Sequence, residues 1–426
     1  MRPNNPIFLI FLSVIAIPLS ATASNLTRTP NIIFIVADYM GYSDTGPYGA
    51  KDIDTPALNK LAKQGIRFSD HYSAAPSCIP SRAAFMSGLY PTKVLRPFNS
   101  NIEIGLPSEN NTLLRGLKAA GYSTGLVGKW HLGMENNFKP SDHGFDLFFG
   151  FNSWTLGYHN HLTSDGKPGL FKNDNLITED GYLTDLFTEQ AIQFIDNNAN
   201  DPFFLYLAFN TGLPPYQGPN LPRAEWETGW DVNAASRSNY IEMVESMDQG
   251  INKVLEKLNA LNLTDDTLVI FTYDHGGRHL VDSSPLFHGF GTLWEGGIRV
   301  PLIIRWPNQA NSGVTISTPT IAMDLTATML DVALQNSAIN NLDGISLLDK
   351  RTDLKPAEER KFFWRRGKMK AVRQGSWKYV IDGNSQLLFN LDADIGERKN
   401  LFAQHPIIVN RLRDALAAWE ISLNKK

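Results

Sequence analysis

The sequence predicts an α/β protein with a large, doubly wound and mainly parallel sheet, followed by a smaller C-terminal α+β subdomain. Short apolar runs at 31–37, 202–209 and 267–272 are separated by amphipathic helical segments. Uninterrupted apolar runs of this length are typical of parallel strands that are buried on both faces. Near the C-terminus the pattern changes: residues 371–380 alternate around a turn, as antiparallel strands do, and residues 405–423 form one helical pattern.

Start and stop signals bound the expected helices. Helices are expected at 55–65, 112–120, 183–197 and 236–261, and further strands at 66–68 and 123–127. Pro56 suits the first turn of its helix, and Gly65 and Gly121 are typical of helix ends. Thr112 is the expected N-cap of the second helix.

The length of the chain sets the number of domains. Its 426 residues suffice for a large α/β domain and a smaller one. We predict a signal peptide at 1–23, a main domain at 24–346 and the C-terminal subdomain at 347–426. The formal net charge is −4, and without a basic excess we expect no nucleic acid as a partner.

The first residues have the pattern of an export signal. Arg2 supplies a positive start, residues 7–19 an apolar core and residues 21–23 a small-residue cleavage site. The apolar core is too short to span a bilayer comfortably, and no later apolar run is long enough. We therefore predict an exported protein, periplasmic or secreted, with no membrane span in the mature chain.

Polar side chains follow the apolar runs at the points where the predicted strands end. Asp38 follows the first run, and the pair Asp274-His275 follows the run at 267–272. Lys129 and His131 follow the strand at 123–127. Since open α/β sheets bind ligands beyond the carboxyl ends of their strands, one edge of the sheet should collect the chemistry. Taken alone, each residue is more often an ordinary polar loop residue or a cap.

Cys78 is the only cysteine in the chain, so it cannot form an intramolecular disulfide. Pro80 and the apolar run that ends at Gly88 place it at or just before a helix N-terminus. The free backbone N–H groups and the helix dipole there favour an anion, and Arg82 lies one turn along the same face. Two interpretations are open: Cys78 is a nucleophile, or it is a small thiol in the core.

The neighbours of Cys78 favour the nucleophile. Cys-Ile-Pro-Ser-Arg-Ala-Ala-Phe-Met-Ser-Gly at 78–88 resembles the signature of the type I, formylglycine-dependent sulfatases. Gly-Lys-Trp-His-Leu-Gly at 128–133 and Asp-His-Gly-Gly at 274–277 resemble further blocks of that family, in its order. The resemblance runs from about Asn31 to Trp419 and implies an arylsulfatase-like member of the alkaline phosphatase superfamily that hydrolyses sulfate esters.

The resemblance implies a role for each residue of these blocks. In the family a maturation enzyme oxidises the signature cysteine to formylglycine, so that enzyme is an expected partner and Cys78 the source of the nucleophile. One hydroxyl of the formylglycine hydrate attacks sulfur, and the other then expels sulfate. Arg82 would hold the hydrate, Lys129 would contact both the sulfate and the formylglycine, and His131 would orient the hydrate.

The resemblance also implies a bound cation. Asp38, Asp274 and His275 match metal positions of the family at the two strand ends. Oxygen and imidazole donors of this kind suit Ca²⁺ or another divalent cation, which would clamp the sulfuryl oxygens.

Three positions depart from the family pattern. Tyr39 stands where a second aspartate ligand is usual, and Leu213 where a histidine usually helps to protonate the leaving group. Phe290 stands where a sulfate-binding lysine is usual. The histidines that are candidates to bind substrate in place of the lost groups are His288, His159 and His161. For each of them, a surface histidine without a role is the alternative.

The expected substrate is a sulfated carbohydrate, because many exported members of the family act on sulfated polysaccharides. Trp154, Tyr158 and Tyr216 are candidates to line a sugar cleft. Two other functions remain open. The three departures are compatible with a catalytically weakened relative that binds sulfated glycans. The site chemistry would also suit a phosphate or phosphonate ester hydrolase of the same superfamily.

Overall fold

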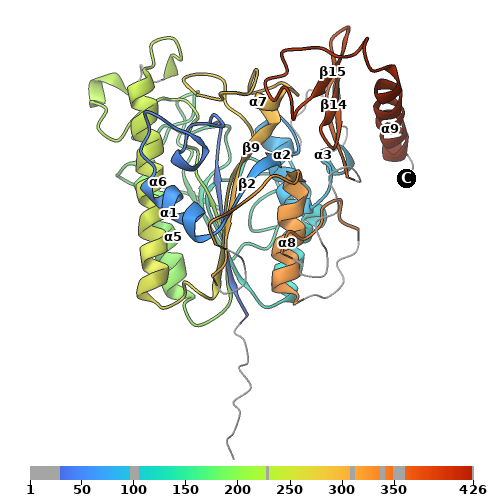
Figure 1. The fold of residues 1–426 in the computed structure, drawn as a ribbon. Coiled ribbons are helices and arrows are strands. Elements are labelled where there is room, and N and C mark those ends of the chain that lie inside the picture. The colour runs from blue at the N-terminus through green and yellow to red at the C-terminus, as the bar shows by residue number, and fades with distance from the viewer. Residues whose placement is uncertain are drawn as a thin grey trace, which may run out of the picture.

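A computed structural model of the chain describes residues 29–95, 105–226, 230–307, 312–335, 341–348 and 360–424. Within these residues an 11-stranded sheet forms the centre of the protein, and a 4-stranded sheet lies beside it (Figure 1). The strand order of the large sheet is β10-β2-β9-β8-β1-β7-β3-β4-β5-β6, with β11 paired to β2. The predicted signal peptide at 1–23 lies outside the described residues.

The large sheet is parallel at its centre and mixed toward its edges. Its strands are β1 (Asn31–Ala37), β2 (Ile66–Tyr72), β3 (Ser123–Lys129), β4 (Leu147–Phe151), β5 (Phe171–Lys172), β6 (Asn175–Leu176), β7 (Phe203–Ala208), β8 (Thr267–Tyr273), β9 (Arg299–Arg305), β10 (Val314–Ile316) and β11 (Thr320–Ile321). β1 pairs in parallel with β7 and β8, and β3 pairs in parallel with β7 and β4. β9 runs antiparallel to both of its neighbours, β8 and β2. The prediction of a large, mainly parallel sheet is therefore confirmed.

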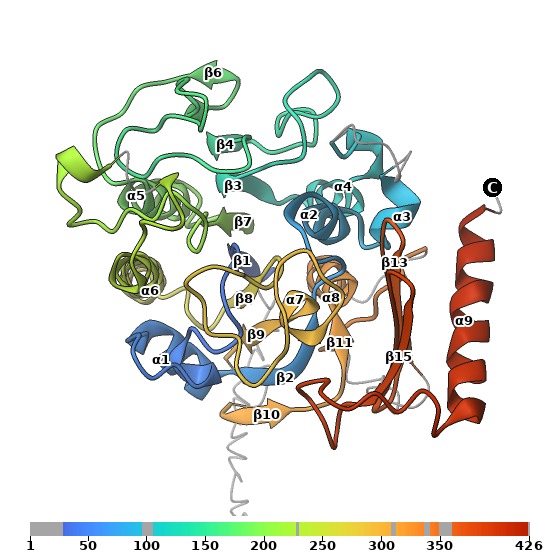
Figure 2. The same ribbon diagram turned by 90° about the horizontal axis from the view of Figure 1, so that it is seen from above.

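Helices cover both faces of the large sheet (Figure 2). One face carries α1 (Pro56–Gln64), α5 (Leu183–Asn197) and α6 (Arg237–Ala260), and the other carries α2 (Cys78–Ser87), α3 (Pro91–Val94), α4 (Thr112–Ala119) and α8 (Ala322–Ala333). Ile33 and Ile35 of β1 pack in the first core, and Ile32 and Phe34 pack in the second. A strand between two apolar layers needs an apolar residue at every position, which explains why 31–37 does not alternate.

Apart from the helix near the C-terminus, the remaining helical elements of the described residues are short. They are α7 (Glu295–Ile298), directly before β9, and the 3-10 helices η1 (Gly46–Tyr48), η2 (Ser108–Asn110) and η3 (Arg223–Glu225). Among the described residues, none of the helices has the length and apolar character needed to cross a membrane.

The helices begin and end close to the predicted positions, but one predicted cap is wrong. α4 starts at Thr112, and the cap is the residue before it, Asn111. Asn111 Oδ1 accepts a hydrogen bond from the backbone N–H of Leu114 at 3.0 Å. An asparagine side chain thus satisfies the free donor of the first turn, and Thr112 is already inside the helix.

The C-terminal subdomain is an antiparallel sheet backed by one helix, as predicted. Its strands pair in chain order and are β12 (Lys361–Arg366), β13 (Met369–Gln374), β14 (Trp377–Asp382) and β15 (Ser385–Asn390). α9 (Pro406–Asn424) lies along the outer face of this sheet (Figure 2).

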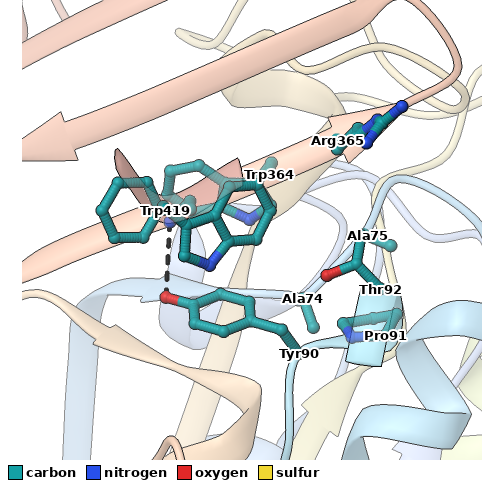
Figure 3. A pocket seen from close by; sticks show the side chains of 9 residues that line it. Ala74, Ala75, Tyr90, Pro91, Thr92, Trp364, Arg365 and Trp419 are labelled. Carbon is teal, nitrogen blue, oxygen red and sulfur yellow. Dashed lines mark hydrogen bonds between the residues drawn. The ribbon is translucent and has the colours of Figure 1, made fainter. Parts of the chain in front are cut away.

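The two sheets share one apolar cluster where they meet. Trp364 of β12 is buried, and its Nε1–H donates to the backbone oxygen of Ser73 at 2.8 Å. Figure 3 shows Tyr90, at the start of α3, beside Trp364 and Trp419 of α9. The rings of Tyr90 and Trp419 are 5.4 Å apart, and the Tyr90 hydroxyl accepts from the backbone N–H of Phe363 at 3.4 Å. The boundary between residues 346 and 347 stays a prediction.

Candidate active site

The carboxyl ends of the central strands bring buried polar residues together. Asp38 follows β1, Asp274 follows β8, and Lys129 ends β3. The register pairs Ala37 with Tyr273, and the backbone N–H of Asp274 donates to Ala37 O at 3.1 Å. The two aspartates therefore stand side by side, and their side chains are fully buried.

Cys78 is the first residue of α2 and its thiol lies in the same group. Its Sγ is 3.0 Å from His275 Nε2 and 3.8 Å from Asp38 Oδ1. The loop before α2 is held by Ser81, whose hydroxyl donates to Ala75 O at 2.9 Å. The predicted position of Cys78 at a helix N-terminus is confirmed, and the fold sets its thiol against both strand ends.

Arg82 connects α2 to three strand ends. Its Nε donates to Asp274 at 3.1 Å, one terminal nitrogen donates to Asp38 at 2.9 Å, and the other donates to Lys129 O at 2.8 Å and to the Tyr206 hydroxyl at 3.2 Å. Burial disfavours the charged guanidinium, but Tyr206 and the two aspartates outweigh it and raise the pKa of Arg82. The sequence did not single out Tyr206, because a tyrosine inside an apolar strand run has no signal that separates it from core residues.

Lys129 and His131 follow a close approach between strands. Gly128 has φ +113°, and a Cβ there would lie 2.0 Å from Ala208 O, so the position requires glycine. Lys129 Nζ donates to Asp38 Oδ2 at 2.6 Å. His131 Nδ1 is buried and has no hydrogen-bond partner among the described residues. Burial, and then the Lys129 charge, hold the pKa of His131 well below its usual value, so the ring is neutral.

Four side chains offer a set of atoms that could hold a metal ion. Asp38, Asp274, His275 and Cys78 each offer one ligand atom, and these atoms lie within 4.8 Å of one another. Asp274 Oδ1 is buried, has no hydrogen-bond partner in the part of the chain described, and lies 3.5 Å from His275 Nε2. His275 Nδ1 lies 3.0 Å from Gly276 O, and donation to that carbonyl leaves Nε2 free as a ligand. Two carboxylates and one imidazole fit a divalent cation.

The electrostatics of this group also favour a cation. Burial opposes ionisation of Asp38, but Lys129 and Arg82 outweigh it and hold the pKa of Asp38 well below its usual range. Burial, and then the Asp38 charge, raise the pKa of Asp274. Burial disfavours a charged His275, but Asp274, Cys78 and Asp38 outweigh it and raise the pKa of His275 to about 10. Without a cation His275 is therefore protonated, and a bound cation would displace the proton from Nε2. Arg82 and Lys129 balance the charges of the two aspartates, so a divalent cation would make the site positive and suited to an anion.

Tyr39 and Phe290, two of the three positions that depart from the family pattern, form an aromatic wall against His275. The ring centroid of Phe290 is 5.0 Å from that of His275 and 5.0 Å from that of Tyr39. Tyr39 has φ +59°, and burial raises its pKa to about 12, so its hydroxyl is protonated. Leu213 is buried after β7. Uncharged side chains thus stand at all three positions where the resemblance implies charged or titratable groups.

The three candidate histidines lie in different surroundings. His288 is exposed and lines a pocket together with Phe290. His159 stacks on Trp226 with ring centroids 4.6 Å apart, and its Nε2 bonds to a backbone oxygen. His161 bonds to another backbone oxygen. His288 lies near the possible metal ligands, because it lines a pocket with Phe290 and the Phe290 ring packs against His275. In the described ranges, His159 and His161 contact other parts of the chain.

The aromatic residues expected at a sugar cleft divide into two groups. Tyr158 and Tyr216 are fully buried, and their hydroxyls donate to backbone oxygens at 2.7 and 3.3 Å. The interpretation of these two as cleft residues is therefore wrong, since core packing and internal hydrogen bonds account for both. Trp154 is 42% exposed and packs edge-on against Trp230 with ring centroids 6.4 Å apart.

Comparison with known sequences agrees with this arrangement. The family model described as Sulfatase matches residues 30–335. An arylsulfatase of Hemicentrotus pulcherrimus is 32% identical over 379 residues, which cover 82% of this chain and 67% of that protein. N-acetylgalactosamine-6-sulfatase of Homo sapiens is 31% identical over 386 residues, which cover 84% of this chain and 72% of that protein.

Comparison with solved structures agrees with this fold. The protein Ps i-CgsB, in complex with k-i-k-neocarrahexaose, superposes with a TM-score of 0.82 at 32% identity, over 92% of this chain and 93% of that one. A protein in complex with D-glucosamine-2-N,6-O-disulfate superposes with a TM-score of 0.76 at 22% identity, over 94% of this chain and 99% of that one. The second likeness concerns the fold alone.

Proposed function

The chain belongs to the sulfatase family and hydrolyses sulfate esters, and from this premise we propose that its substrate is a sulfated carbohydrate and that its nucleophile is formylglycine made from Cys78. The observation that carries the proposal is the position of Cys78, whose Sγ lies 3.0 Å from His275 Nε2 at the edge of a buried group of charged side chains. One hydroxyl of a formylglycine hydrate would attack sulfur and displace the sugar hydroxyl from it. Deprotonation of the other hydroxyl would then re-form the aldehyde and expel sulfate. An unconverted thiol lacks the second hydroxyl and could not complete the reaction.

The surrounding side chains position the nucleophile and balance its charge. Arg82 holds both aspartates through direct hydrogen bonds, and so keeps the strand ends in register with the start of α2. Lys129 brings a second buried positive charge to the same place. His131, with its unpartnered Nδ1, is the residue that can accept a hydrogen bond from the nucleophile and orient it.

We propose Asp38, Asp274 and His275 as the ligands of Ca²⁺ or another divalent cation. A bound cation would polarise the sulfuryl oxygens and offset the negative charge that develops on them. The unpartnered Asp274 Oδ1 supports the assignment, because a buried carboxylate oxygen without a donor is costly unless a cation faces it.

The carbohydrate substrate is supported by the relatives at or above 30% identity. One of them is an N-acetylgalactosamine-6-sulfatase, and another was solved with a neocarrahexaose. The first name points to a sulfated amino sugar, and the second to an oligosaccharide. The exposed Trp154 offers an aromatic face of the kind that sugar rings pack against.

Export and maturation complete the proposal. The positive start, apolar core and small-residue site at the N-terminus support export to the periplasm or the medium. The signature at 78–88 supports recognition by a formylglycine-generating enzyme of the host.

Peptide mass spectrometry of the protein purified from its own host tests the nucleophile. The peptide that contains Cys78 should show the defined mass loss of conversion to formylglycine, and the converted protein should hydrolyse aryl sulfates and sulfated oligosaccharides. A native protein that retains the thiol would contradict the mechanism and would leave glycan binding as the better function. Faster turnover of phosphate or phosphonate esters than of matched sulfate esters would instead reassign the substrate class.

A further inference from the structure

A pocket of about 560 Å³ opens beside the proposed metal group. Its lining residues come from the loop after β8 and from the segment before α7, and among them are Gly277, Arg278, Asp282, His288, Phe290 and Thr292. Phe290 lines this pocket and also contacts the proposed metal site, because its ring centroid lies 5.0 Å from that of His275. The pocket therefore adjoins the proposed metal site across Phe290, although none of the proposed metal ligands lines it.

The two loops are locked together at their backbones. The backbone N–H of Phe290 donates to Gly277 O at 2.9 Å. A Cβ on Gly276 would lie 1.9 Å from Gly296 O, and one on Gly289 would lie 2.1 Å from Gly277 O. Because side chains are excluded there, the backbones approach closely and the pocket has a preformed floor.

Arg278 is a positively charged side chain of this pocket that stabilises no other part of the described chain. It is exposed, and in the part of the chain that the structure describes it makes no ion pair and no hydrogen bond. Arg82 and Arg299, by contrast, are buried and bonded to carboxylates. The carboxylate that lines the pocket, Asp282, already accepts the backbone N–H of Ser284 at 2.8 Å. A guanidinium without a partner beside such a pocket is suited to bidentate binding of an oxyanion.

The charge of Arg278 acts on the histidine that lines the pocket. Burial lowers the pKa of His288, Asp382 opposes that effect, and Arg398 and Arg278 add to it. Arg278 and His288 both line the pocket, so the two side chains lie within electrostatic reach of each other.

A second guanidinium approaches from the C-terminal subdomain. Arg398 lies over the ring of Phe287 at 4.2 Å from the ring centroid. Asp382 is the nearby acid, and its Oδ2 accepts from the Trp294 indole at 3.0 Å. Phe287 does not line the pocket, but its ring centroid lies 4.0 Å from that of His288, which does. Positive charge and aromatic rings therefore adjoin the pocket, and together they suit an anionic sugar.

We propose that this pocket is a subsite for a second anionic group of the glycan, a sulfate or a carboxylate, and that Arg278 binds that group. The inference rests on the proposed function, because the subsite adjoins the group of residues assigned to sulfate cleavage. It deepens that function by making a multiply charged glycan the preferred substrate.

Inhibition of 4-nitrophenyl sulfate turnover by matched oligosaccharides tests the subsite. One set of pairs shares a sugar backbone and differs in a single sulfate, as in neocarrahexaoses or N-acetylgalactosamine-containing oligosaccharides. A second set differs in a single uronate carboxylate. For the wild-type protein the more charged member of at least one pair should inhibit about tenfold better, the size of one charge-assisted bond. In Arg278→Ala that ratio should fall to about one to two, and Arg278→Lys should retain part of it.

The matched control is Arg411→Ala. Arg411 is an exposed arginine of α9, and that helix lies on the outer side of the C-terminal sheet (Figure 2). Its removal should leave every ratio unchanged. The set of pairs that responds identifies the bound group as sulfate or carboxylate. Ratios that are the same in Arg278→Ala and the wild type for every pair would overturn the subsite.

Calorimetric titration of the full chain with the same oligosaccharides separates this inference from the proposed function. A protein that binds the pairs in an Arg278-dependent way but turns over no sulfate ester keeps the subsite and loses the mechanism. A protein that hydrolyses sulfate esters with no dependence of the ratio on Arg278 keeps the mechanism and loses the subsite.

Discussion

Two clusters of buried charges can be compared in the part of the chain that the structure describes, and we assign the chemistry to one of them. The active-site cluster consists of Asp38, Arg82, Lys129, Asp274 and His275. The interface cluster, between the main sheet and the C-terminal sheet, consists of Asp70, Glu295, Arg299, Arg373, Lys378 and Glu397. Both are almost completely buried.

The clusters differ in how completely their acids are paired. In the interface cluster, Lys378 Nζ lies 2.8 Å from Glu295 and 2.9 Å from Glu397, and Arg373 lies 2.5 Å from Asp70. Glu397 Oε1 has no hydrogen-bond partner among the described residues, but Lys378 Nζ lies 2.9 Å from it. In the active-site cluster, Asp274 Oδ1 also has none, and neither has Nδ1 of the nearby His131. Buried charge alone therefore does not mark a functional site; a buried charged group with a free ligand atom beside a pocket does.

The largest effect should come from Cys78→Ala. It removes the source of the nucleophile, so we expect activity to fall by roughly four orders of magnitude or more. The midpoint of urea unfolding should change little, because Cys78 makes no ion pair and is only half-buried. A variant that keeps a tenth of the wild-type activity would contradict the assignment.

Lys378→Met should have the opposite kind of effect, a loss of stability. It leaves Glu295 and Glu397 buried without their shared cation, and we expect the free energy of unfolding to fall by about 3–5 kcal/mol. Urea unfolding measures the change. Lys118→Met is the matched control: Lys118 pairs with Asp146, both side chains are 41–50% exposed, and the loss should stay below about 1 kcal/mol. Equal losses in the two variants would show that the interface cluster contributes no more than a surface pair.

Removal of divalent cations tests whether the unpartnered Asp274 Oδ1 of the active-site cluster binds a cation. EDTA should abolish activity and lower the free energy of unfolding by about 3 kcal/mol if the cation had been present at a hundredfold its Kd. In Asp274→Asn the effect of EDTA on unfolding should disappear, whereas in Lys118→Met it should persist. An EDTA effect of the same size in Asp274→Asn would exclude Asp274 as a ligand.

The smallest predicted effect concerns a buried histidine outside both clusters. His71 bonds to Thr320 through Nδ1 at 2.8 Å, and burial lowers its pKa to about 3. The unfolded chain binds the proton near pH 6.5 and the folded chain does so only near pH 3. Stability is therefore complete above pH 6.5 and is lost as the pH falls, by about 2 kcal/mol between pH 7 and 5. His71→Asn should flatten that dependence in urea unfolding, and an unchanged pH profile would contradict it.

The polar residues at the carboxyl ends of the strands of the main sheet were largely predictable from the sequence. Continuous apolar runs indicated buried parallel strands, and the residue after each run was polar, as at Asp38 and Asp274. The interface cluster was not predictable in the same way. Arg373 and Asp70 are 303 positions apart along the chain, and neither stands in a local pattern that distinguishes it from a surface charge. Arg278 was missed for the same reason, since only the spatial neighbours of a side chain show whether it has a partner.

Local sequence patterns were enough to predict the alternation of strands and helices, the signature around Cys78 and the groups at the strand ends. Which of these groups meet was set by the three-dimensional fold. It placed Cys78 beside His275, buried Tyr158 and Tyr216 that could have faced a sugar, and joined Phe290 to Tyr39 as a wall. The physical reason is that hydrogen bonding, burial and charge balance depend on distances in space, and parallel sheets are assembled from segments far apart in the chain.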